Sequence, residues 1–190
     1  MIMKDYKMIS GRNIAVLLKI IAMKGKPWNQ QMLSAELEIP QSEISNSLKR
    51  LRQARLLIKI NTTDIVALSA CEEFFVHGFR YVFPLNRVGK GKGIVTSYAA
   101  PIFKDAFLAS ENKPVWINAL GNDEGVGIEP LYDKLPDVIL KNPDNEFYNL
   151  LTTVDALREQ RVRERNLARE KFKIALDNYA KEQNSYNTAH

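Results

Sequence analysis

The stretch IPQSEISNSLKRLRQARLLI, from Ile39 to Ile58, constrains the fold more than any other part of this chain. Its apolar residues Ile44, Leu48 and Leu51 recur at spacings of four and three, which predicts a helix with one buried face over about residues 42–55. The opposite face carries only polar and basic side chains. Such a helix is either an ordinary surface helix or one that lies in the major groove of DNA.

The flanking sequence adds further elements in a fixed order. Periodic apolar residues over 10–24 predict a first helix, and residues 29–38 predict a short second helix with Asn29 as its N-cap. After the third helix, for which Ser42 is a suitable N-cap, two β-branched runs at 57–60 and 65–68 surround a polar turn and predict a hairpin. This order of helices and hairpin is that of a winged helix-turn-helix.

In that fold the second helix supports the third, whose exposed face meets the base edges. Side chains suited to reading bases gather at the start of the predicted third helix: Gln41, Ser42, Ser45, Asn46 and Lys49. Gln and Asn can bond adenine with two hydrogen bonds, and Lys can reach guanine. Cationic side chains suited to phosphates lie further along: Arg50, Arg52, Arg55 and, in the hairpin, Lys59. Phosphate contacts give affinity without sequence information.

The run MLSAELEIPQSEISNSLKRLRQARLLI resembles the winged helix-turn-helix of bacterial MarR- and ArsR-type transcriptional regulators, and the resemblance covers about residues 13–68. It implies sequence-directed binding to double-stranded DNA, usually as a homodimer. By position, it implies that Gln41, Ser42, Ser45, Asn46 and Lys49 read the bases.

Four positions differ from that family. Glu38 replaces a turn glycine, and Arg55 replaces the glycine that ends the recognition helix in the left-handed conformation. The hairpin tip at 61–64 has no Arg or Lys, and Glu43 places an acid where a phosphate would approach. These departures leave open an alternative in which the fold holds a protein partner.

Charge and composition bound the setting. Residues 1–80 contain 12 Lys and Arg against 7 Asp and Glu, whereas residues 81–190 contain 15 of each, so the net charge of +5 lies in the N-terminal part. This favours a polyanion partner there. The single cysteine, the absence of a signal-peptide pattern and the lack of an apolar run of about 20 residues predict a cytoplasmic protein without membrane segments.

The remaining sequence predicts an α+β protein with three segments: a DNA-binding domain at 1–80, a less regular segment at 81–144 and a long helix at 145–183. We expect helices at 70–79 and 102–109, short strands at 80–83, 94–98 and 115–117, and a loop at 89–93 (GKGKG). The C-terminal helix could present a solvated charged face, a second DNA-facing surface or a dimer interface. Its apolar stripes favour the dimer interface.

No set of acid, base and nucleophile can be assembled, so we expect no enzyme, and we expect no metal or cofactor. GKGKG lacks the spacing of a phosphate-binding loop, and Asp123, Glu124 and Glu129 have no His or Cys nearby. Cys71 and His77 fit a packed helix better than a reactive site. A ligand-responsive switch is a further alternative, in which Trp116, Tyr98 and Tyr132 line a site between the halves.

The second half is similar, in HGFRYVFP, GIVTSYAAP, GIEPLY and VDALREQRVRERNLA, to a group of predicted bacterial regulators that have a winged helix in front. Such regulators can accompany nucleotidyltransferase-like toxins. We therefore predict a dimeric repressor. The alternative is an antitoxin whose C-terminal half neutralises a toxin while its N-terminal domain autoregulates.

Overall fold

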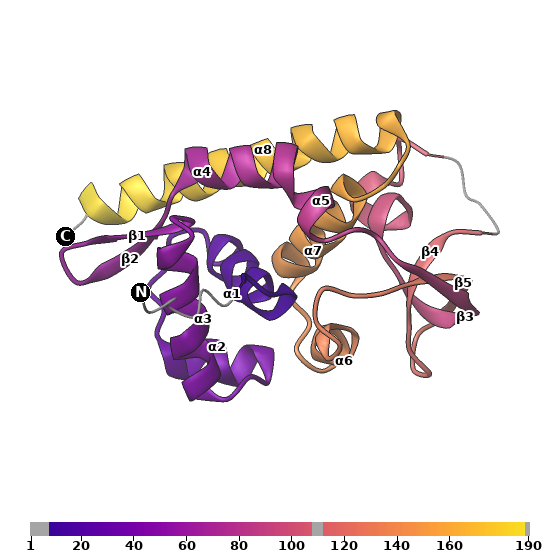
Figure 1. The fold of residues 1–190 in the computed structure, drawn as a ribbon, viewed down its shortest axis with the longest axis horizontal. Coiled ribbons are helices and arrows are strands. Elements are labelled where there is room, and N and C mark those ends of the chain that lie inside the picture. Colours follow the sequence, from indigo (N-terminus) through magenta and orange to yellow (C-terminus); the bar gives the residue numbers. More distant parts are fainter. Residues whose placement is uncertain (1–7, 108–111, 189–190) are drawn as a thin grey trace, which may run out of the picture.

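In the computed structural model the chain is a mixed α+β protein whose longest element is the C-terminal helix (Figure 1). The structure describes residues 8–107 and 112–188. The helices are α1 (Gly11–Ala22), α2 (Gln30–Leu37), α3 (Gln41–Gln53), α4 (Leu68–Glu73), η1 (Phe74–Gly78), α5 (Phe79–Val82), η2 (Ser97–Ala99), η3 (Pro101–Phe103), α6 (Leu135–Lys141), α7 (Asn145–Leu157) and α8 (Val162–Thr188). The strands are β1 (Leu57–Ile60), β2 (Thr63–Val66), β3 (Arg87–Val95), β4 (Pro114–Ile117) and β5 (Asp123–Ile128). The predicted α+β class and long C-terminal helix are confirmed.

Local hydrogen bonds determine where α2 and α3 begin. Asn29 caps α2 as predicted, because its side chain accepts the N–H of Met32 at 2.9 Å. The predicted Ser42 cap is wrong, since α3 already begins at Gln41. The carbonyl of Pro40 accepts the N–H groups of residues 43 and 44, at 2.9 and 3.0 Å, so the first helical turn encloses Ser42.

A tight hairpin follows α3. β1 pairs antiparallel with β2, and Ile60 lies opposite Thr63, so only two residues form the turn. The second strand therefore begins two residues earlier than predicted, and Leu68 belongs to α4. Asn61 has a φ of 54°, a left-handed conformation that Asn tolerates better than most residues.

Residues 68–82 form a nearly continuous helical stretch, α4–η1–α5, whose middle part is π-helical. This includes the helix predicted at 70–79, whereas the strand predicted at 80–83 is wrong. Cys71, Phe75 and Phe79 are buried at spacings of four and form one apolar stripe. Phe79 lies on this helical stripe, and the residues after it form the short helix α5, which ends at Val82, in place of the predicted strand.

β3, β4 and β5 each pair with the other two, so this small sheet closes on itself. The predicted GKGKG loop is wrong, because these residues lie within β3. Glycine permits the close approach of the strands: a Cβ at Gly93 would lie 2.1 Å from the carbonyl oxygen of Trp116. The strand predicted at 115–117 is confirmed within β4, and that at 94–98 is the end of β3, which stops at Val95.

Two further helix predictions differ from the structure. Only the short η3 forms within the helix predicted at 102–109, whose last two residues lie outside the described residues. The single helix predicted at 145–183 is broken into α7 and α8. At the break Arg158 turns inward, and its guanidinium donates to the carbonyls of Phe83 and Pro84 at 3.0 Å each, which a continuous helix surface would not allow.

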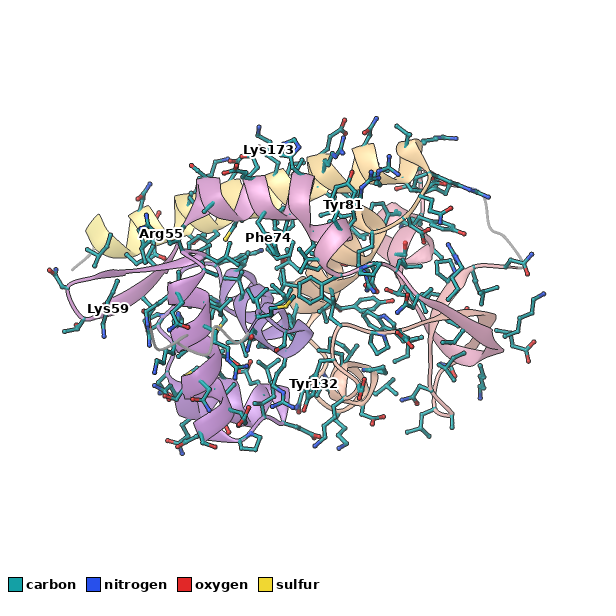
Figure 2. All side chains as sticks on the ribbon, viewed as in Figure 1. Arg55, Lys59, Phe74, Tyr81, Tyr132 and Lys173 are labelled. Atoms are coloured by element: carbon teal, nitrogen blue, oxygen red, sulfur yellow. The ribbon has the colours of Figure 1, made fainter. Side chains whose placement is uncertain are left out.

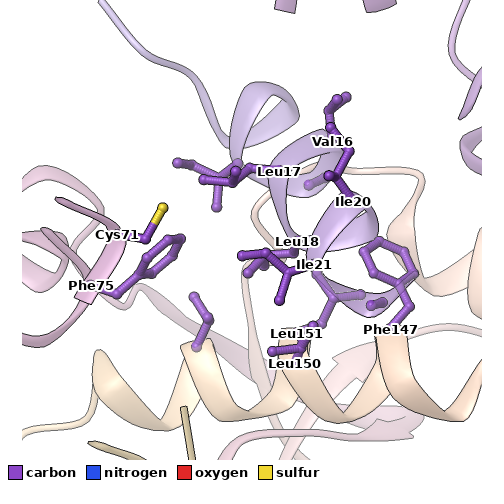
Figure 3. Close-up of a cluster of buried hydrophobic side chains, with 14 of the residues drawn as sticks. Val16, Leu17, Leu18, Ile20, Ile21, Cys71, Phe75, Phe147, Leu150 and Leu151 are labelled. Atoms are coloured by element: carbon purple, nitrogen blue, oxygen red, sulfur yellow. The ribbon is translucent and has the colours of Figure 1, made fainter. Parts of the chain in front are cut away.

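One hydrophobic core runs through all three predicted segments (Figure 3). Leu18 of α1 packs in a cluster with Phe75 and with Leu151 of α7, and the same core includes Trp116 and Phe172. The boundaries proposed at 80/81 and 144/145 therefore do not separate cores. Among the described residues, no helix combines the length and apolar character needed to cross a membrane.

Candidate nucleic-acid interface

α3 is fixed to the core by the face that its apolar spacing predicts. Ile44, Leu48 and Leu51 are buried. Between them Ser47 is also buried, and its hydroxyl accepts a hydrogen bond of 2.9 Å from the side-chain amide of Asn13 in α1. This buried polar contact fixes the rotation of α3 about its axis, because another rotation would leave both groups unsatisfied.

The residues expected to read bases lie on the free side of α3. All five are exposed: Gln41, Ser42, Ser45, Asn46 and Lys49. The structure therefore brings them together on one outward surface. Gln53 is exposed too, and its spacing from Asn46 and Lys49 extends the same helix face by one turn. The sequence interpretation missed Gln53, although the spacing of 46, 49 and 53 could have identified it.

The predicted phosphate contacts are divided. Arg55 and Lys59 are exposed and lie toward the hairpin end of the molecule (Figure 2). Arg50 is half-buried. Arg52 donates to the carboxylate of Asp64 in β2 at 2.7 Å, so this pair links α3 to the hairpin and occupies the guanidinium. Of the predicted cations, Arg52 is thus the least available to a phosphate.

The missing glycine at the end of α3 does not alter the geometry. Arg55 takes a φ of 59°, in the left-handed region. Its N–H donates to the carbonyl of Arg52, and the N–H of Leu56 donates to that of Leu51, both at 3.0 Å. These are the two bonds of a Schellman motif, which glycine ordinarily ends. Glu38 at the end of α2 is also left-handed, with a φ of 52°.

The acid at the start of α3 is neutralised within the fold. Glu43 accepts a hydrogen bond of 2.8 Å from the guanidinium of Arg12, and both side chains are partly exposed. Arg12 also lies over the ring of Tyr132, 5.2 Å from its centroid. A phosphate that approached the helix start would therefore meet an ion pair and not an unpaired carboxylate. The contact between Arg12 and Glu43 was not predicted, because the two residues lie 31 positions apart in the chain.

An open hollow of about 1050 Å³ borders α3 between the α1–α2 turn and the hairpin. Its lining includes Lys26, Asn29, Gln30, Gln41 and Thr62. The hollow widens the polar surface beyond α3 itself. The place of Lys26 and Gln30 was not predicted, because these residues and the hairpin line the same hollow only in the tertiary fold.

Other candidate sites carry no comparable arrangement. Burial raises the pKa of Cys71 to about 12, so the thiol stays protonated, and its sulfur lies 3.5 Å from the carbonyl oxygen of Leu56. Among the described residues no group of three His, Cys, Asp or Glu is placed to hold a metal. Of the three aromatic residues expected to line a common site, Trp116 is buried, and Tyr98 lines a pocket whose walls include neither Trp116 nor Tyr132.

Comparisons of the chain with protein-family models, with curated proteins and with solved structures find no match. The resemblance to MarR- and ArsR-type regulators therefore stays a prediction.

Proposed function

We propose that the N-terminal region is a winged helix-turn-helix, and that the protein is a transcriptional regulator that binds specific sequences in double-stranded DNA. The observation that carries this proposal is the exposed polar face of α3. Its apolar face is fixed by the core and by the Asn13–Ser47 hydrogen bond. A rigid helix with exposed amides and hydroxyls suits the major groove, where hydrogen bonding distinguishes the base pairs.

The surrounding charges support the same proposal. Arg55 and Lys59 supply exposed cations at the hairpin end of α3, and Arg12 offsets the charge of Glu43. Contacts of this kind position a protein on the duplex by releasing counterions from phosphates. The first 80 residues also carry an excess of basic side chains, and this positive charge favours binding to the negatively charged DNA.

A repressor of this kind would act in the cytoplasm as a dimer, with two recognition helices about 34 Å apart on successive major grooves. The apolar side of α8, which favoured a dimer helix, is buried against the protein's own chain at Ala168, Phe172, Leu176 and Tyr179. A homodimer would therefore use another surface. The same burial weakens the antitoxin alternative, since α8 has no free apolar stripe at these positions with which to hold a toxin.

The decisive experiment selects bound sequences from a random duplex library and then measures binding by gel shift. We expect Asn46→Ala to lose about 1–3 kcal/mol of discrimination at one base pair. Lys49→Ala should likewise lose specific binding, because Lys49 is expected to reach a guanine base. Asn122→Ala and Lys104→Ala are matched controls on exposed residues outside the interface.

Both interface variants should retain the wild-type circular dichroism spectrum, because the two side chains are exposed. If no sequence is enriched, or if Asn46→Ala and Lys49→Ala bind the selected duplex as the controls do, the proposal is wrong.

A further inference from the structure

A second pocket, of about 1090 Å³, lies where α8 begins, at the opposite end of this helix from the hairpin. Its walls come from α5, the start of β3, η2 and the first turn of α8, and Tyr81 on its rim is labelled in Figure 2. These segments are far apart in the sequence. None of the expected DNA-contacting residues lines the pocket.

The lining of this pocket carries an excess of positive charge. Its lining contains five arginines and two glutamates. Arg158 is paired with Asp155 and Arg87 with Glu159, at 2.7 and 2.8 Å. Arg80 donates to the hydroxyl of Tyr81 and Arg163 to the carbonyl of Ala106, so these two guanidinium groups leave positive charge in excess within the described lining.

Further positive charge lies just outside the pocket. Burial and then the charges of Arg80 and Arg169 hold the pKa of Arg165 below its ordinary value. Arg165 also donates a hydrogen bond of 2.9 Å to the carbonyl of Glu159, which lines the pocket, so its charge lies beside the pocket. The α8 N-terminus, which starts at Val162, adds backbone N–H groups that favour an anion.

Aromatic rings accompany the arginines. The guanidinium of Arg80 lies 4.6 Å from the ring centroid of Tyr81, and that of Arg163 lies 5.3 Å from that of Phe107. Tyr98 meets Phe107 edge to face, with centroids 5.9 Å apart. Flat π-systems beside guanidinium groups are the surfaces on which nucleobases stack.

A buried acceptor completes the lining. The side chain of Glu164 is only 6% exposed, and its Oε1 lies 3.5 Å from Arg161. Its Oε2 is buried without a hydrogen-bond partner in the described structure. A buried carboxylate oxygen of this kind requires a donor, and a ligand hydroxyl would supply it. A carboxylate is the group that commonly binds the hydroxyls of a ribose.

We propose that this pocket binds a nucleotide, with its phosphates on the arginines, its base on the aromatic rings and a ribose hydroxyl on Glu164. Arginine suits the phosphates because its planar donors match phosphate oxygens in pairs. The proposal goes beyond DNA binding and does not depend on it, because the pocket and the exposed face of α3 share no residue.

The test is calorimetric titration of the full chain, without DNA, with ADP, GDP, CDP and UDP in turn, and with adenosine and inorganic phosphate as partial ligands. We expect at least one diphosphate to bind with a Kd below about 1 mM. Adenosine and phosphate should each bind at least about tenfold more weakly, because each satisfies only part of the lining. The 2′-deoxy form of the best ligand should also bind more weakly if Glu164 accepts the 2′-hydroxyl.

Variants separate this pocket from general charge effects. Arg163→Glu should weaken binding at least about tenfold, because it replaces an attraction for phosphate with a repulsion. Lys181→Glu makes the same charge change on α8, about 27 Å further along at 1.5 Å per residue, and should leave binding unchanged. The proposal is overturned if none of the four diphosphates binds, or if both variants bind the best ligand alike. A failure here would leave the gel-shift result with duplex DNA unaffected.

Discussion

The buried carboxylate of Asp155 accepts hydrogen bonds from three side chains. It is fully enclosed, and one carboxylate oxygen accepts from Thr96 Oγ1 and Trp116 Nε1 at 2.7 and 2.8 Å. The other accepts from Arg158 at 2.7 Å. Burial raises the pKa of Asp155, and the charge of Arg158 opposes that shift. The hydrogen bonds from Thr96 and Trp116 therefore join the sheet region to the end of α7, where the ion pair lies.

We expect Asp155→Ala to lower the free energy of unfolding by about 3–5 kcal/mol, because it leaves the Arg158 guanidinium buried without its counter-ion. Urea unfolding followed by circular dichroism measures the change. Asp177→Ala on the exposed side of α8 is the control and should change stability by no more than about 0.5 kcal/mol. Equal stability of the two variants would show that the buried pair contributes little.

Asp144 gives a pH-dependent prediction. Burial alone would raise its pKa, but hydrogen bonds from Lys19 and from the N–H of Phe147 outweigh this and lower it below 3.8. The ionised form is thus favoured by folding, so its stabilisation is present above about pH 4 and is lost as pH falls through the lowered pKa.

Asp144→Asn keeps a residue that can cap α7 but removes the charge opposite Lys19, which lies 2.7 Å away. We expect a loss of about 1 kcal/mol at pH 7 that shrinks toward zero as the pH falls below 3.8. Urea titrations of both proteins across this range test it. A stability difference that stays constant with pH would contradict the assigned role of the charge.

In the candidate interface, α3 is followed by a left-handed residue that is not glycine. α3 ends in a Schellman motif although Arg55 occupies the left-handed position, and β1 follows directly. The hydrogen bonds from residues 55 and 56 and the burial of Leu56 hold this turn. Any residue other than glycine is costlier for the backbone at this position, and the proposed phosphate contact of Arg55 would offset that cost.

Arg55→Gly should therefore raise the free energy of unfolding by about 0.5–1 kcal/mol, because glycine adopts a positive φ without steric cost. It should at the same time weaken DNA binding and its salt dependence, as the phosphate contact is lost. Arg55→Ala is the matched variant, since it removes the same charge without relieving the backbone. If Arg55→Gly bound DNA as tightly as the wild type, Arg55 would not be a phosphate contact.

In the whole molecule, α8 extends from the pocket at its first turn to the hairpin (Figure 1). Phe172 of α8 packs on Phe75, with ring centroids 4.6 Å apart, and Tyr179 accepts the N–H of Val66 at 3.4 Å. A Cβ at Gly25 would lie 2.8 Å from the Cα of Gln183, so α8 also closes on the α1–α2 turn. We infer that the described chain unfolds as one cooperative unit.

Phe172→Ala should lower the free energy of unfolding by about 3–5 kcal/mol, because it removes a fully buried ring from that common core. The transitions reported by circular dichroism and by fluorescence of Trp28 and Trp116 should coincide before and after the change. Ile174→Ala, two residues away but 57% exposed, is the control and should cost about 1 kcal/mol or less. Two separate transitions would contradict a single core.

The sequence by itself determined the features that depend on neighbouring residues. The spacing of Ile44, Leu48 and Leu51 predicted which face of α3 is buried and hence which side chains are exposed. The Asn29 cap and the hairpin after α3 also follow from local chemistry. The spacing of apolar residues in a helix predicts which of its side chains face the interior, and this spacing can be read from the sequence of that helix alone.

Only the tertiary structure decided which segments meet. Strand pairing is non-local, so GKGKG became part of a closed sheet because residues 114–128 lie beside it. The break after α7 follows from carbonyls about 75 residues earlier in the chain, which draw Arg158 inward. The pocket at the start of α8 likewise brings Arg80 and Arg163 together. A sequence specifies the charge of such side chains, but their common location depends on the packing of the whole chain.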